Sequence, residues 1–273
     1  MKTYLKIILF IAATAILIDI FQRYLPLGYV YFNFDLFLAI LIPTVLTHLL
    51  INKKISLEFL KLNKIDTFNI FIILGITAIG ILIPFLLKAS LSDFTINFNF
   101  PITDLIDLLI IMFFIAIFEE MAFRGIIFQW LKLEYGPSFA ILSTSFVFAL
   151  LHSKNIGFDL LSFTNVFIAG ILMAFLVNKS GRILISAIFH FLWNISLPLF
   201  VQSNVSGNNY VSIINFENNH NFVNTLLFGG EFGIESGLIT TIVLIILLIL
   251  SNKFIKISPY SEARYLRKLY IKV

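Results

Sequence analysis

Eight apolar runs, most of them close to 20 residues long, dominate the sequence and limit what the chain can fold into. About 20 apolar residues in a helix match the roughly 30 Å hydrocarbon core of a bilayer. Breaks such as "YGPS" (135–138) and "NKSGR" (178–182) separate neighbouring runs. The sequence therefore predicts an all-α, polytopic membrane helix bundle with about eight transmembrane helices, at residues 4–21, 34–51, 68–88, 104–131, 136–152, 160–178, 182–201 and 234–251.

The composition excludes a water-soluble protein. The chain has 273 residues, of which 59% are hydrophobic and 12% charged, and its mean hydropathy is +0.99. Soluble domains carry roughly 25% charged residues. One soluble core could not bury so much apolar surface. The chain also has no cysteine, so it contains no disulfide, thiolate metal ligand or cysteine nucleophile.

The distribution of Lys and Arg predicts the orientation of the chain. With eight spans and a cytoplasmic N-terminus, the 19 Lys and Arg residues all fall in cytoplasmic segments, except Arg23, Lys88 and Lys154 outside and Arg124 within a span. Cytoplasmic loops of membrane proteins are enriched in these residues. The pattern therefore supports a bundle with both termini cytoplasmic.

The segments around the spans complete a single predicted membrane domain over residues 1–273. Residues 202–233 contain no Lys or Arg and are expected to form an outer loop, whereas 252–273 are expected to form a basic cytoplasmic tail facing lipid headgroups. The basic start, short apolar run and small residues of 1–21 are typical of a cleaved secretory signal as well as of a first helix. Either interpretation leaves the orientation of the other spans unchanged.

Three formal charges stand inside the span at 104–131, in "FEEMAFRG" (118–125). A charge at membrane depth is costly, so it normally faces the bundle interior with a partner. Glu120 and Arg124 are four residues apart and are expected to pair on one helix face. Glu119 points about 100 degrees away from Glu120 and has no basic partner on its own face. Such a carboxylate is a candidate functional residue.

His152, His190 and Asn194 supply most of the other polar chemistry in the spans. Either His alone is explained by a helix-to-helix hydrogen bond. Together with Glu119, the three residues allow hydrolysis through an activated water and oxyanion donors, a zinc site, or proton relay and transport. The His-Glu-x-x-His helix of zinc proteases is absent, and so are the related halves of a transporter.

Three motifs occur in order along these helices: Glu-Glu-x-x-x-Arg at 119–124, Phe-x-x-x-His at 148–152 and His-x-x-x-Asn at 190–194. In this order they resemble the CPBP family of intramembrane proteases, which includes the type II CAAX prenyl endopeptidases and bacteriocin-processing and self-immunity proteins. The resemblance covers about residues 105–200. It extends to "GGEFGIESG" (229–237), which is similar to the small-residue segment before that family's last helix.

The resemblance implies a glutamate-type intramembrane endopeptidase with its protease core at about 104–201. Glu119 and His152 would activate the attacking water, and His190 and Asn194 would stabilise the oxyanion. The supporting residues would be Glu120, Arg124 and Phe148, with the ion pair orienting Glu119 and tuning its protonation. No cofactor is expected, and zinc held by Glu119, His152 and His190 is the alternative.

The expected partners are the lipid bilayer and a membrane-associated peptide or protein substrate, with no nucleic acid. No feature of the sequence sets an oligomeric state. The abundance of Ile, Phe, Asn and Lys suits an AT-rich genome, which favours the cell membrane of a bacterium or archaeon. The distances of the motifs from the flanking charges predict a site at mid-membrane or toward the outer half. The alternative is a non-proteolytic scaffold or immunity protein with the same fold.

Overall fold

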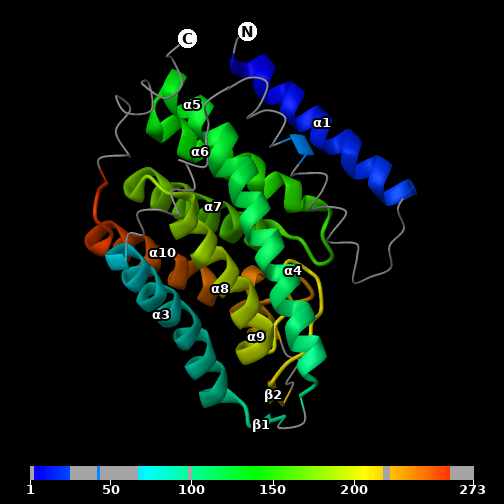
Figure 1. The fold of residues 1–273 in the computed structure, drawn as a ribbon. Coiled ribbons are helices and arrows are strands. Elements are labelled where there is room, and N and C mark those ends of the chain that lie inside the picture. Colours follow the sequence, from blue (N-terminus) through cyan, green and yellow to red (C-terminus); the bar gives the residue numbers. More distant parts are fainter. Residues whose placement is uncertain (1–2, 25–41, 44–66, 98–99, 218–221, 259–273) are drawn as a thin grey trace.

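A computed structural model describes residues 3–24, 42–43, 67–97, 100–217 and 222–258, which are mainly helical, as predicted (Figure 1). The predicted span at 34–51 lies almost wholly outside the described residues, as does the tail from 259 onward. Helix α1 (Thr3–Tyr24) covers the predicted first span at 4–21 and extends a few residues beyond its predicted end. The number of spans and the side on which the termini lie stay predictions.

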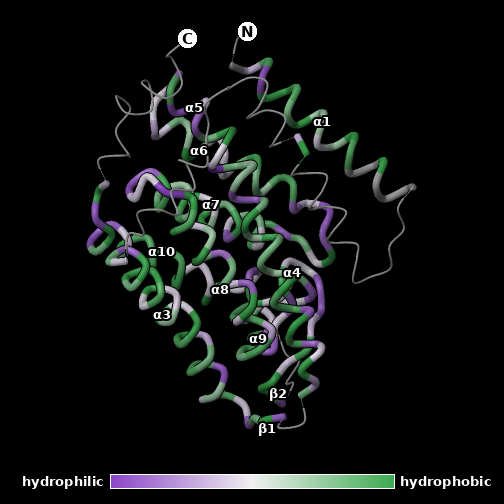
Figure 2. Tube along the Cα trace, in the orientation of Figure 1, coloured by the Kyte–Doolittle hydropathy of each residue, from purple (hydrophilic) through white to green (hydrophobic). Residues whose placement is uncertain are grey.

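The remaining helices follow the predicted apolar runs to within a few residues. They are α3 (Thr67–Leu91), α4 (Ile102–Glu120), α5 (Phe128–Tyr135), α6 (Pro137–Leu151), α7 (Leu160–Ser180), α8 (Ile183–Val201), the unpredicted α9 (Phe222–Phe228) and α10 (Leu238–Phe254). Among the described residues, α3, α7 and α8 are long and apolar enough to cross a membrane, by length and composition, and α10 is a shorter apolar helix. The helices are mainly hydrophobic along their length (Figure 2).

The predicted span at 104–131 is one continuous helical rod from α4 through a π-helix, η1 (Met121–Ile127), to α5. The rod ends at Gly136, whose φ of 87° is readily adopted only by glycine, and α6 then begins with Pro137. Gly181 ends α7 in the left-handed region, with φ 69°. Both predicted breaks are therefore present, and both follow from the conformational properties of Gly and Pro.

Helix α8 lies at the centre of the bundle and packs against α3, α4 and α7 (Figure 1). Fourteen of its nineteen residues are buried, whereas α3 buries only one stripe. Helix α7 packs in turn against α6 and α10. The central position of α8 places His190 and Asn194, which this helix carries, in the interior of the bundle.

The predicted outer loop contains a small amount of regular structure. Strand β2 (Ile214–Phe216) pairs antiparallel with β1 (Phe94–Ile96), and Phe94 lies opposite Phe216. Lys88 of α3 donates from Nζ to the carbonyl of Val201 at 2.7 Å, which caps the end of α8. Neither strand was predicted, because three-residue strands are too short to show an alternating pattern.

We expect Gly170→Ala to destabilise the bundle, because α6 and α7 approach closely at this residue. A Cβ on Gly170 would lie 2.9 Å from Cβ and 3.0 Å from Cα of Ser145. Overpacking of this kind costs about 1–3 kcal/mol of unfolding free energy. The measurement is the thermal unfolding midpoint of the detergent-purified protein.

Gly75→Ala in α3 is the matched control, since its Cβ would have no neighbour within 4 Å. Replacing a helical Gly by Ala in open space is expected to stabilise the helix by about 0.5–1 kcal/mol. Equal midpoints for the two variants would contradict the close α6–α7 contact.

Candidate active site

The predicted pair of Glu120 and Arg124 forms in the centre of the bundle. Both side chains are 0% exposed, and Nη1 of Arg124 lies 2.8 Å from Oε1 of Glu120. Ser186 of α8 donates a hydrogen bond to the other carboxylate oxygen. Nη2 of Arg124 donates to the carbonyl of Gly170 on α7 at 3.2 Å. The pair therefore links the α4 rod to α7 and α8 and offsets its own desolvation with further hydrogen bonds.

The first motif lies at the junction between α4 and the π-helix. Glu119 and Glu120 are the last residues of α4, and Arg124 lies in the middle of η1. The N–H of Phe128 bonds to the carbonyl of Phe123, five residues earlier, and Nε2 of Gln129 bonds to the carbonyl of Arg124 at 2.9 Å. Single π-helical turns within α-helices occur frequently at functional sites.

Glu119 is the more accessible of the two carboxylates. Its side chain is 21% exposed, and its Oε2 lies 3.9 Å from Nε2 of His190 on α8. The other ring nitrogen of His190, Nδ1, lies 3.3 Å from Oε1 of Glu120, without the alignment of a hydrogen bond. His190 therefore stands between the two carboxylates, a contact across helices that the sequence alone did not predict.

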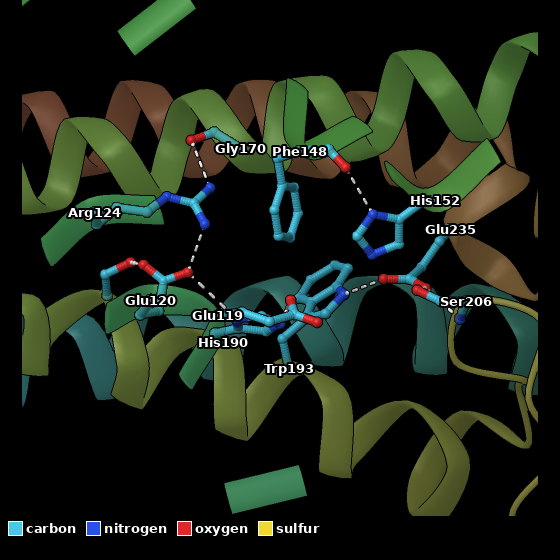
Figure 3. Close-up of polar contacts among 11 residues, drawn as sticks. Glu119, Glu120, Arg124, Phe148, His152, Gly170, His190, Trp193, Ser206 and Glu235 are labelled. Atoms are coloured by element: carbon cyan, nitrogen blue, oxygen red, sulfur yellow. Dashed lines mark hydrogen bonds and ion pairs between the residues drawn. The ribbon is translucent and has the colours of Figure 1, made fainter. Parts of the chain in front are cut away.

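His152 lies at the other end of the site, where α6 passes into the 3₁₀ turn η2 (His152–Lys154) (Figure 3). Its Nδ1 is 2.8 Å from the carbonyl of Phe148. A carbonyl only accepts, so Nδ1 carries the proton and Nε2 is left as an acceptor. No ion pair joins His152 to Glu119 in the described part of the chain.

The ring of Phe148 lies beside both histidines (Figure 3). Its centroid is 4.7 Å from that of His152 and 6.3 Å from that of His190. On the other side, the guanidinium carbon of Arg124 lies 4.6 Å from the Phe148 ring centre, within the range of a cation–π contact. Phe148 thus packs against residues of all three motifs, and it is itself buried.

Asn194 follows His190 by one turn on the same face of α8. The residue is 6% exposed. Within the described residues, its side-chain amide makes no hydrogen bond. An amide without a protein partner can bind a ligand or a reacting group through its N–H donors and its carbonyl oxygen.

The zinc alternative requires three ligands around one point. Among the described residues, no group of three His, Cys, Asp or Glu side chains is arranged so that it could hold a metal ion. Glu119 and His190 are close, whereas no ion pair joins His152 to either of them within the described residues. The described part of the chain therefore offers no preformed three-residue ligand set, and the presence or absence of a metal stays a prediction.

One polar residue near the site, Glu235, was missed by the sequence analysis. It lies in η3 (Ile234–Ser236), and its carboxylate accepts hydrogen bonds from Trp193 and Ser206 (Figure 3). The segment "GGEFGIESG" was interpreted only as a run of small residues, although it contains a signal for a half-buried carboxylate. That signal is an acidic residue without a basic neighbour between two apolar helices.

The helical bundle, with its buried charge pair and adjacent polar side chains, defines an integral membrane protein with a candidate hydrolytic site. Residues 101–196, about a third of the chain, match the family described as type II CAAX prenyl endopeptidase Rce1-like. This segment contains all three motifs and belongs to that family, which confirms the predicted resemblance. At family level, this segment is therefore that of an intramembrane protease of the CAAX type. Comparisons with curated proteins and with solved structures gave no match.

We expect Glu120→Gln to destabilise the protein far more than Glu119→Gln. The first change leaves the fully buried Arg124 without its partner, at a cost of about 3–5 kcal/mol in unfolding free energy. The second removes a partly exposed charge whose approach to His190 is long, so we expect a change within about 1 kcal/mol. Thermal unfolding in detergent measures both, and equal losses would contradict this division between the two carboxylates.

Proposed function

We propose that the chain is an endopeptidase that hydrolyses peptide bonds of membrane-associated peptides or proteins with a water activated by Glu119. The observation that carries this proposal is the contrast between the two adjacent carboxylates. Glu120 is fully buried and engaged by Arg124, whereas Glu119 is partly exposed and lies beside His190. A carboxylate held in place but still accessible is suited to act as a general base.

In the proposed reaction, Glu119 takes a proton from water while the water oxygen bonds to the carbonyl carbon of the substrate. His152 approaches the same water from the other side through Nε2, the nitrogen that does not bond to Phe148. Collapse of the tetrahedral intermediate breaks the C–N bond, and Glu119 returns the proton to the leaving amine.

His190 and Asn194 would stabilise the negative charge on the substrate oxygen. They share one face of α8, and both offer nitrogen donors: the ring Nε2 of His190 and the amide of Asn194. Pre-positioned donors in a site shielded from water stabilise an oxyanion strongly. The amide of Asn194 makes no other hydrogen bond among the described residues, which leaves it free for this role.

The proposed substrates are hydrophobic peptides that reach the site from the bilayer of a bacterial or archaeal cell membrane. The family description points to prenylated substrates, but nothing in the chain's own residues requires a prenyl group. An assay should therefore use pairs of peptides, with and without a prenylated cysteine. A non-proteolytic scaffold or immunity protein with the same fold is the alternative.

We predict that Glu119→Gln lowers the cleavage rate by about 10²–10⁴-fold, because the general base is lost. The measurement is cleavage of the peptide pairs by detergent-purified protein, with and without a strong chelator. Loss in the variant together with chelator resistance of the wild type would support a glutamate-type protease. Loss of wild-type cleavage in chelator would instead support the zinc alternative. Undiminished cleavage by the variant would refute the mechanism.

We predict that Asn194→Ala lowers kcat by about 10²–10³-fold with little change in KM, because an oxyanion donor acts only in the transition state. Asn252→Ala is the matched control, since Asn252 is exposed near the end of α10. A rise in KM at constant kcat would move Asn194 from oxyanion stabilisation to substrate binding.

A further inference from the structure

We propose that Glu235 is a positioning residue that fixes the rotation of α8, and with it the placement of His190 and Asn194. This role rests on the proposed function for its effect on cleavage, but the contact itself does not. Glu235 belongs to the segment 229–237 before α10 and lies outside all three motifs.

The two carboxylate oxygens of Glu235 have different partners. Oε1 accepts a hydrogen bond from the indole N–H of Trp193 at 3.3 Å. Oε2 accepts from the backbone N–H of Ser206 at 2.8 Å and from its hydroxyl at 3.1 Å. The carboxylate thus joins α8 to the chain segment that follows α8. An amide could not replace it fully, because one end of an amide only donates.

The segment that carries Glu235 is itself held firmly. The side-chain amide of Asn165 on α7 donates to the carbonyls of Glu235 and Gly237 at 2.8 and 3.0 Å. Gly233 has φ 101°, and a Cβ there would lie 2.1 Å from the carbonyl oxygen of Asn204. Glu235 therefore presents its carboxylate from a fixed backbone.

The same segment contacts the turn that follows His152. A Cβ on Gly157 would lie 2.4 Å from the backbone nitrogen of Phe232, and the rings of Phe158 and Phe232 pack at 5.7 Å. His152 and Glu235 lie at the same end of the site (Figure 3). The segment 229–237 therefore connects the region of His152 with Trp193 on α8.

Ser206 supports the argument through its backbone. Its φ of 48° is uncommon for a residue other than glycine. Glu235 engages both the N–H and the hydroxyl of this residue, and these bonds stabilise the strained turn. Oε2 of Glu235 is thus fixed by Ser206, and Oε1 is directed toward the indole N–H of Trp193.

Trp193 transmits this contact to the site. It lies three residues after His190 and directly before Asn194, so its direction sets the direction of both. Its ring packs on Phe189, with centroids 5.9 Å apart, and lies against the Gly80 backbone of α3, where an added Cβ would be 3.3 Å from Cζ3. With the indole N–H bound to Glu235, α8 cannot turn without breaking the hydrogen bond.

The link between Glu235 and Trp193 can be tested without a substrate. The chain has two Trp residues, so Trp130→Phe leaves Trp193 as the only one. In that background we expect Glu235→Gln to shift the emission maximum of Trp193 and to increase its quenching by acrylamide. Glu231→Gln, at an exposed residue of the same segment, should do neither. Unchanged emission and quenching in a folded Glu235→Gln protein would overturn the proposal.

Cleavage of the peptide pairs tests the positioning role. We expect Glu235→Gln and Trp193→Phe each to lower kcat by about tenfold, and the double variant to lose no more than either, because both break one contact. Losses that multiply, or an equal loss in Glu231→Gln, would overturn the role. If Glu235→Gln does not fold, Trp193→Phe and Ser206→Ala carry the test. Trp193→Phe removes the indole N–H and Ser206→Ala removes the hydroxyl, and both leave the carboxylate in place. A wild type that cleaves no peptide while the emission shift is present would overturn the proposed function and leave the link standing.

Discussion

The rest of the structure depends on one fully buried ion pair, that between Glu120 and Arg124. Neither side chain has access to solvent, so each must be satisfied by protein groups. The required donors and acceptors come from Ser186 on α8 and from the carbonyl of Gly170 on α7. The hydrogen bonds that satisfy the pair therefore join the rod formed by α4 and η1 to α7 and α8.

The candidate site lies directly beside this pair. Glu119 lies at the same end of α4 as Glu120 but is partly exposed. His190 of α8 lies close to both carboxylates. Phe148 packs against the Arg124 guanidinium and against both histidines, so one aromatic ring contacts residues of all three motifs. The result is a small group of polar side chains enclosed by apolar helices, in which an accessible carboxylate stands next to a buried one.

Much of this arrangement could be predicted from the sequence, and the exceptions share a physical cause. The pairing of Glu120 with Arg124 followed from helical spacing, and the breaks at Gly136 and Gly181 followed from the conformational properties of glycine. The π-helix at 121–127 was not predicted, because its five-residue hydrogen bonds leave no trace in an apolar sequence. Glu235 was missed because its partners are more than 25 residues away along the chain.

The sequence by itself determined the class of protein: apolar runs require helices in lipid, and three motifs within 101–196 identify the protease family. Local spacing also determined which carboxylate would be paired. Only the tertiary structure decided that Glu119 meets His190 rather than His152, and that Glu235 binds Trp193. Periodicity describes the faces of one helix, whereas the rotation and depth of neighbouring helices are set by packing between them. Contacts across helices are therefore decided only when the bundle forms.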